Sequence, residues 1–131
     1  MEITIQDLVA YMPMSQIIEA LDDNGDGAVD KSVWQSIVDA NQRRISDLFN
    51  ATAIPTQALH LCQSALLLLC ASTLYTRRGF YGEANPLHRE ATAAMERLAR
   101  IASAAEPLPD ATRGEAITQP AKIAGTGAFI L

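Results

Sequence analysis

The stretch "LHLCQSALLLLCASTLY", residues 59–75, decides the fold, because it is a long apolar run in the middle of the chain. It is 17 residues long and contains five polar side chains: His60, Gln63, Ser64, Ser72 and Thr73. A membrane-spanning helix needs about 20 mostly apolar residues, so we expect no membrane contact. A helix that is apolar all round lies in a protein interior. We therefore predict the central helix of a small bundle, buried on nearly all sides.

The segments on either side of this run are expected to form long amphipathic helices. Residues 31–50 carry one apolar stripe: Val33, Trp34, Ile37, Val38, Ile45, Leu48 and Phe49. Residues 86–105 carry another: Leu87, Ala91, Ala94, Met95, Leu98, Ile101, Ala102 and Ala105. Apolar residues three and four apart lie on one face of a helix. Each segment is therefore predicted to pack its stripe on the central helix.

A polar residue, Asn41, falls on the first stripe between Ile37 and Ile45. An asparagine inside a helix seam fixes register or partner choice. At the edge of a stripe the same side chain only touches water. The sequence leaves both interpretations open.

Local signals predict two short helices at the N-terminus. Thr4 and Asp7 have the spacing of a capping box in front of residues 5–12. Ser15 is the expected cap of a second short helix at 16–21, after Pro13 has ended the first.

The ends of the long helices carry signals of the same kind. Asp30 is the expected N-cap of the helix at residue 31, and Thr56, after Pro55, is the expected cap of the central helix. Arg77, Arg78 and Gly79 suit a helix C-terminus, where cations and a left-handed glycine are favoured. The arginine pair therefore has a structural explanation, and a binding role is the alternative.

These elements predict an all-α protein of about three long and two short helices. At 131 residues with 49% hydrophobic and 5% aromatic side chains, the chain is long enough for one core built mostly from aliphatic residues. Residues 1–105 form the predicted helical domain. Residues 106–131 contain three prolines and three glycines and predict an extended or flexible tail. Its apolar end, Phe129, Ile130 and Leu131, is a candidate partner-binding segment.

The charge is distributed unevenly along the chain. Residues 1–30 hold seven acidic side chains and no Lys or Arg, whereas residues 31–131 hold ten basic and eight acidic ones. An acidic N-terminal region disfavours a surface that grips DNA there. A DNA-binding regulator would have to use Arg43, Arg44, Arg77 and Arg78 as phosphate contacts, and no recognition helix is evident.

Neither the cysteines nor any sequence motif indicates a disulfide, a catalytic site or a cofactor site. Cys62 and Cys70 are eight residues apart, about 12 Å along a helix, which is too far for a disulfide. We interpret them as buried thiols in a reducing cytosol, and the N-terminus lacks the features of a signal peptide. The sequence contains no phosphate-binding, nucleophile-elbow or zinc-protease motif. We expect no enzyme activity and no required cofactor.

The stretch "DDNGDGAVD", residues 22–30, resembles part of a calcium-binding EF-hand loop. Starting from Asp22, the ligand positions are occupied by Asp22, Asn24, Asp26, the carbonyl of Ala28, and Asp30. Position twelve, which normally supplies a bidentate glutamate, is Val33. Any calcium would therefore bind weakly. The same residues also explain a tight turn followed by a helix cap.

The order of these parts resembles the small head–tail connector (adaptor) proteins of tailed bacteriophages, of the kind found in Mu-like phages and prophages. The resemblance covers residues 1–105 and rests on the stretches "LDDNGDGAVDKSVW", "DANQRRISDLF", "LYTRRG" and "ANPLHREATAAMERLARIA" in that order.

The resemblance implies a structural virion protein of the phage neck, assembled in the host bacterial cytoplasm. Its partners would be further copies of itself in a ring, commonly of twelve, the portal protein above, and a tail or stopper protein below. DNA would pass through the ring without specific binding. The alternative from another class is a small calcium-responsive helical binding module.

Overall fold

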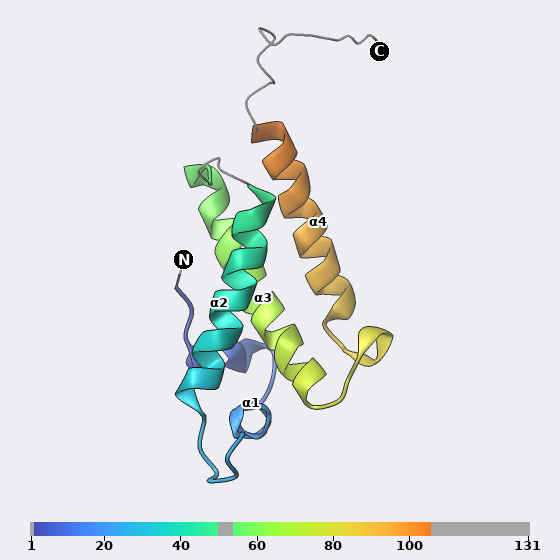
Figure 1. Cartoon of the computed structure of the whole chain (residues 1–131). Helices are drawn as coiled ribbons and strands as arrows, with labels where there is room; N and C mark the ends of the chain where they lie inside the picture. The colour runs from blue at the N-terminus through green and yellow to red at the C-terminus, as the bar shows by residue number, and fades with distance from the viewer. Residues whose placement is uncertain (1, 50–53, 106–131) are drawn as a thin grey trace, which may run out of the picture.

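Residues 2–49 and 54–105, described by a computed structural model, form an all-α fold (Figure 1). The three long helices are α2 (Lys31–Leu48), α3 (Leu59–Arg77) and α4 (His88–Ala105), and α1 (Met14–Leu21) is shorter. Three 3₁₀ turns complete the fold: η1 (Ile5–Ala10), η2 (Thr56–Ala58) and η3 (Gly82–Ala84). The predicted fold class is confirmed. The predicted tail at 106–131, with Phe129, Ile130 and Leu131, lies outside the described residues.

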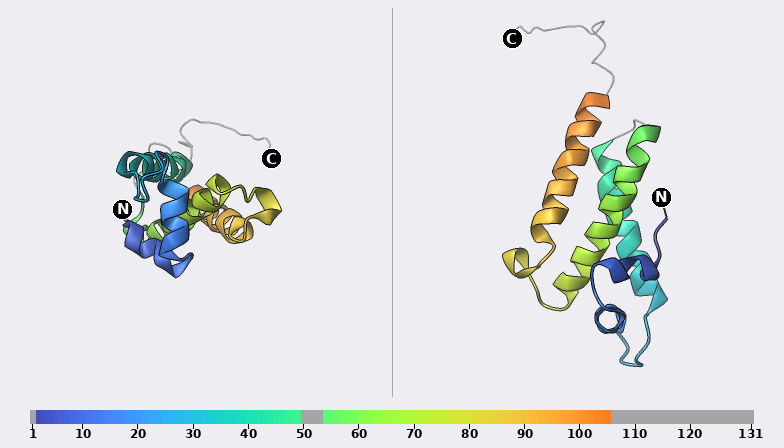
Figure 2. Two further views of the ribbon diagram at one scale, coloured as in Figure 1. Left: turned by 90° about the horizontal axis from the view of Figure 1, so that it is seen from below. Right: turned by 180° about the vertical axis from the view of Figure 1, so that it is seen from behind.

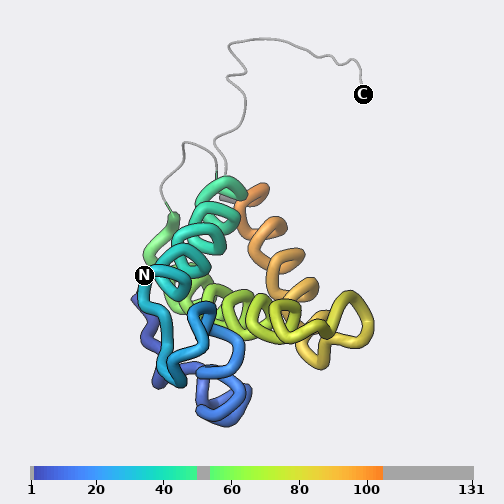
Figure 3. Tube along the Cα trace, turned by 60° about the horizontal axis from the view of Figure 1, so that its bottom comes forward, coloured from blue at the N-terminus to red at the C-terminus, as the bar shows by residue number. Residues whose placement is uncertain are grey.

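Helix α3 is at the centre of the arrangement. It contacts α2, α4, α1 and η1, and the two views in Figure 2 show α2 and α4 on different sides of it. The C-terminal ends of α2 and α4 lie near each other, and their N-terminal ends diverge (Figure 3). The segment from Glu2 to Tyr11, which contains η1, contacts α3 at Gln63 and at Tyr75, and helix α1 lies beside the C-terminal end of α3.

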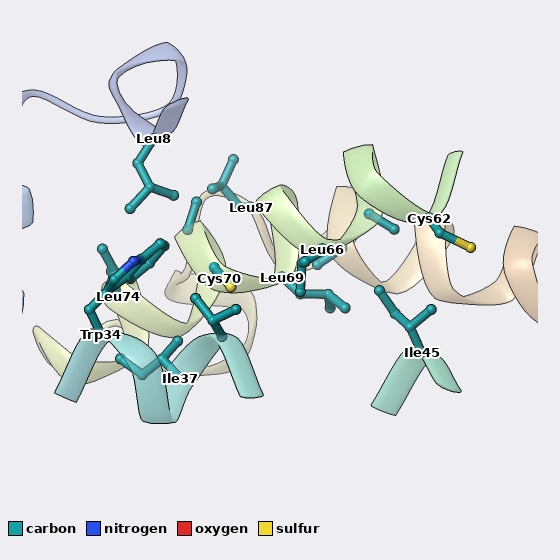
Figure 4. Packing of buried hydrophobic residues seen from close by; sticks show 14 of the residues in the cluster. Leu8, Trp34, Ile37, Ile45, Cys62, Leu66, Leu69, Cys70, Leu74 and Leu87 are labelled. Carbon is teal, nitrogen blue, oxygen red and sulfur yellow. The ribbon is translucent and has the colours of Figure 1, made fainter. Parts of the chain in front are cut away.

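The core is built around α3, with Leu8 on one side of this helix and Ile37 and Ile45 on the other (Figure 4). Helix α3 contributes seven buried residues: Cys62, Ala65, Leu66, Leu69, Cys70, Ala71 and Leu74. The stripe predicted for α2 is buried at Trp34, Ile37, Val38, Ile45 and Phe49 and partly buried at Val33 and Leu48. The stripe predicted for α4 is buried at Leu87, Ala91, Leu98 and Ala102. Both amphipathic predictions are confirmed. Cys62 and Cys70 are free and fully buried, as expected.

The prediction that the central helix is buried on nearly all sides is wrong for its first half. Leu59 is 44% exposed, and Leu61, Leu67 and Leu68 are only partly buried. Among the described residues, Thr56–Arg77 is the one helical stretch whose length and mean hydropathy of 1.5 would suit a membrane span. In its most apolar part, 44% is buried inside the protein. Core helices of soluble proteins reach the same length and hydropathy. The helices within residues 2–49 and 54–105 are too few to surround α3, so these residues leave one side of it uncovered.

Two of the predicted caps are confirmed. The backbone N–H of Thr4 donates to Asp7 Oδ2 at 2.8 Å, and the N–H of Asp7 donates to Thr4 Oγ1 at 3.3 Å, which forms the capping box. Asp30 Oδ1 accepts from the N–H groups of Ser32 and Val33 at 3.1 and 3.4 Å. Each cap lies within three residues of its partner, so it is decided locally.

The other two predicted caps are wrong. Helix α1 begins at Met14 after Pro13, and α3 follows η2, which starts after Pro55. Neither Ser15 nor Thr56 makes a side-chain cap bond. Proline has a fixed φ near the helical value and no N–H to satisfy, so the chain begins to turn directly after it.

Helix α4 starts at His88, later than the predicted residue 86, because Asn85 packs against α3. The side chain of Asn85 is buried, and its Nδ2 donates to the carbonyl of Ser72 at 2.9 Å and to Thr76 Oγ1 at 3.2 Å. Its Oδ1 accepts from the N–H of Leu87 at 2.9 Å. The connection between α3 and α4 is thereby fastened to the last turns of α3.

Candidate functional site

The Asp-rich loop between α1 and α2 is closed by its own side chains. The carboxylate of Asp22 accepts hydrogen bonds from the N–H groups of Asp26 at 3.0 Å and Gly27 at 2.7 Å. Asn24 Oδ1 accepts from Asp26 N–H at 3.2 Å. Gly25 and Gly27 have φ of 75° and 79°, which the two tight turns require. These are the Asx-type turns that aspartate and asparagine favour.

The predicted calcium ligands therefore lie around a turn: Asp22, Asn24, Asp26, Ala28 and Asp30. The side-chain oxygens of the four polar ones already accept hydrogen bonds from backbone amides. Asp26 Oδ1 accepts from Ala28 N–H at 3.0 Å, and Asp30 Oδ1 accepts from Ser32 Oγ at 2.7 Å. Within residues 2–49 and 54–105, no group of three or more His, Cys, Asp or Glu side chains is close enough to hold a metal ion. Val33, at the twelfth position, faces the core.

The charge state of the loop follows from these bonds. The hydrogen bond from Gly27 N–H holds the pKa of Asp22 below its ordinary value of 3.8. The hydroxyl of Ser32 lowers the pKa of Asp30 in the same way. Both carboxylates are therefore stabilised as anions by groups within the protein.

Arg77 and Arg78 bind the N-terminal part of the chain. Arg77 Nε donates to the carbonyl of Ala20 at 2.8 Å, and its Nη2 pairs with Asp23. Arg78 Nε pairs with Glu19 at 2.9 Å. The arginine pair thus joins the end of α3 to α1 and to the acidic loop. Sequence reasoning identified the cations but not their partners, which lie more than fifty residues away.

The last turn of α3 ends in a Schellman motif. The N–H of Gly79 donates to the carbonyl of Thr76 at 2.9 Å, and the N–H of Phe80 donates to that of Tyr75 at 3.0 Å. Gly79 has φ of +99°, as predicted for the residue after the helix. The rings of Tyr75 and Phe80 meet edge to face with centroids 6.0 Å apart. Arg78 lies over the Phe80 ring at 5.5 Å.

A hollow of about 500 Å³ lies between helices α2 and α4. Its floor is Leu69, Ser72, Thr73 and Thr76 of α3. The three hydroxyls are engaged within the protein: Asn85 donates to Ser72 Oγ at 3.1 Å, Thr73 donates to the carbonyl of Leu69 at 2.8 Å, and Thr76 donates to the carbonyl of Ser72 at 3.2 Å. No activated nucleophile is formed there.

A smaller hollow brings together three residues that sequence reasoning did not connect: Asp7, His60 and Ser64. These are the residue types of a catalytic triad, but no hydrogen bond joins any two of them. The Asp7 carboxylate is bound to Thr4 N–H instead. A triad requires a base hydrogen-bonded to both its nucleophile and its carboxylate, so this cluster has no catalytic geometry.

Comparison of the chain with protein-family models, with curated protein sequences and with solved structures finds no match in any of the three. The function is therefore inferred from the residues of this chain and their arrangement.

Proposed function

We propose that this protein is a structural subunit of the head–tail connector class of tailed bacteriophages, acting in the neck of the virion. It forms a ring beneath the portal and joins the DNA-filled capsid to the tail, without enzyme activity and without a required cofactor. The observation that carries the proposal is the order and proportion of the elements. Short η1 and α1, a tight acidic loop, long α2, apolar α3 and amphipathic α4 follow the pattern on which the resemblance rests.

The charges support passage of DNA rather than a grip on it. Of the four arginines that a DNA-binding regulator would use, Arg77 and Arg78 are paired with acidic side chains, and Arg44 Nη1 donates to Asn41 Oδ1 at 3.2 Å. The charges of Arg77 and Arg78 are thus partly neutralised by carboxylates of the same chain. A strongly salt-dependent affinity for duplex DNA is therefore not expected.

A deletion in the phage tests the proposal. Phage that lack the gene are expected to accumulate DNA-filled heads without tails, and a plasmid copy of the gene should restore joined particles. Electron microscopy of the purified protein mixed with portal protein should show a ring on the portal. Infectious, tailed particles from the deletion strain would show that the protein is not the connector.

The candidate partner-binding segment Phe129, Ile130 and Leu131 has its own test. Removal of residues 126–131 is expected to weaken attachment to the portal or to neighbouring copies, with the helical circular dichroism unchanged. Replacement of the three apolar residues by serine is the matched variant of equal length. Normal particle assembly by both variants would contradict a docking role.

The alternative, a calcium-responsive binding module, is favoured only by the loop at residues 22–30. That loop links α1 to α2 and contains the carboxylates of Asp22 and Asp26. These oxygens already accept hydrogen bonds from backbone amides, and a metal ion there would share them. Calorimetry with calcium separates the two proposals.

A further inference from the structure

Among the described residues, no segment covers one face of α3 along the first half of the helix. Leu61, Ser64 and Leu68 follow one another at three- and four-residue steps and so share one face. Leu61 and Leu68 are only partly buried, and Ser64 is exposed. Together with Tyr11, Ala94 and Leu98 they line a shallow hollow of about 110 Å³. A helix that is apolar on all sides is normally covered, so this face is suited to contact with another protein surface.

One side of the open face is basic. Helix α4 borders it with Ala94, Arg97 and Leu98, and Arg100 is exposed one turn further along. Within residues 2–49 and 54–105, neither Arg97 nor Arg100 takes part in a hydrogen bond or an ion pair. Two guanidinium groups therefore stand unpaired beside an apolar strip. We call Arg97 and Arg100 the basic flank.

The other side of the open face is acidic. The segment that includes η1 crosses α3 there, with the Gln63 side chain donating to the carbonyl of Glu2 at 3.0 Å. Glu2 and Asp7 are exposed, and neither carboxylate pairs with a cation in the described part of the chain. Val9 of η1 is an exposed apolar side chain at 42%. We call Glu2, Asp7 and Val9 the acidic flank.

From this arrangement we infer that the open face of α3 is the contact between neighbouring copies of the chain, with the basic flank of one copy against the acidic flank of the next. The apolar strip supplies the centre of the contact, and the unpaired charges supply its rim, which is the usual anatomy of an interface. Opposite charges on the two flanks select the second copy over an unrelated surface.

The geometry of the contact suits a pair of copies. The open face of one copy packs on the open face of the other, so both copies use the same self-complementary patch, as in a two-fold contact. A two-fold axis along the apolar strip places the basic flank of each copy against the acidic flank of the other. The inference goes beyond the proposed connector function, because a ring would need a second contact through different surfaces.

Sedimentation of the full-length protein tests the contact. Self-association is expected at protein concentrations up to about 1 mM, the range in which weak contacts are populated. Raising the ionic strength from about 0.05 M to about 0.5 M should weaken it, because salt screens exposed charges. A strictly monomeric protein at low salt would overturn the inference, whereas a dimer that dissociates at high salt would support it.

Two charge variants sharpen the test. The basic-flank variant is Arg97→Glu with Arg100→Glu. The acidic-flank variant is Glu2→Arg with Asp7→Asn, and asparagine keeps an oxygen for the Thr4 N–H. Each variant alone is expected to associate at least about tenfold more weakly, since like charges then meet. Mixed together, the two variants should recover association, because their reversed flanks are complementary to each other.

A control with the same charge change as the basic-flank variant is Lys31→Glu with Arg43→Glu, both exposed on α2. It should associate like the natural protein. Unchanged association in either flank variant, or no recovery in the mixture, would overturn the inference. The phage deletion is independent of these measurements: tailed particles would remove the connector function and leave the contact standing, whereas a monomer in solution would remove only this contact.

Discussion

Asn41 of α2 donates a hydrogen bond from Nδ2 to the hydroxyl oxygen of Thr73 of α3 at 3.2 Å, inside the contact between the two helices. The same amide nitrogen reaches the carbonyl of Ile37 at 3.1 Å. Asn41 is 3% exposed, so of the two interpretations left open by the sequence, the edge of the stripe is excluded. The residue is a buried polar link between α2 and α3.

Replacement of Asn41 by alanine is expected to destabilise the fold by about 1–3 kcal/mol, because a cavity forms and the buried polar link is lost. Replacement by leucine should cost less, since it fills the space with an apolar group of similar size. Urea unfolding of both variants measures the difference. A larger loss for Asn41→Leu than for Asn41→Ala would show that the hydrogen bonds outweigh the packing.

Replacement of Arg77 by alanine should loosen α1 and the acidic loop. The guanidinium bridges the Ala20 carbonyl and the Asp23 carboxylate, and hydrogen bonds to a charged group contribute about 1.5–3 kcal/mol when well buried. Because Arg77 is partly exposed, we expect a loss of about 1 kcal/mol. Hydrogen exchange should accelerate at residues 14–27 and not in α4. Arg100→Ala is the control, and equal effects of the two would contradict the link.

Replacement of Gly79 by alanine should strain the end of α3. Its φ of +99° is unfavourable for any residue with a Cβ, although no atom lies within 4 Å of the added carbon. The cost is therefore one of backbone conformation, about 1–2 kcal/mol. Thermal unfolding measures it, and Ala84→Gly in η3 serves as a nearby comparison. An unchanged midpoint would mean that this turn relaxes without cost.

Calcium is expected to have little effect. The loop oxygens accept amide hydrogen bonds and Val33 stands where a bidentate glutamate is normally found. Calorimetry should give no saturating heat at micromolar calcium, and circular dichroism should not change. Saturable heat that is lost in an Asp22→Ala variant would favour the calcium-responsive module over the connector.

Alkaline pH should destabilise the protein through Cys70. Burial raises the pKa of its thiol from 9.0 to about 11, and the hydrogen bond from Asn41 acts in the opposite direction. A raised pKa in the folded state gives a contribution that is complete below about pH 9 and is lost as the pH rises toward about 11. The folded protein therefore loses up to about 3 kcal/mol relative to a Cys70→Ala variant, at about 1.4 kcal/mol for each of the two pKa units. Unfolding in urea at several pH values checks this, and parallel curves for both proteins would contradict it.

Much of the fold was predictable because it depends on neighbours in the sequence. The stripes of α2 and α4 repeat at helical spacing, and the caps at Thr4 and Asp30 bind amides within three residues. Gly79 follows its helix directly. The misplaced caps at Ser15 and Thr56 have a local cause too, since a proline had already begun each turn.

The open face of α3 and the partners of its arginines could not be predicted from the sequence, because they depend on the tertiary structure. A hydropathy pattern cannot say how many helices are available to surround α3, so its open face was not foreseen. Nor can spacing pair Arg77 with Ala20 and Asp23 while leaving Arg97 unpaired. By itself, the sequence determined where helices begin, end and carry apolar faces, because these follow from interactions over a few residues. Only the packing of distant segments decided which polar groups are buried and which apolar surface remains uncovered.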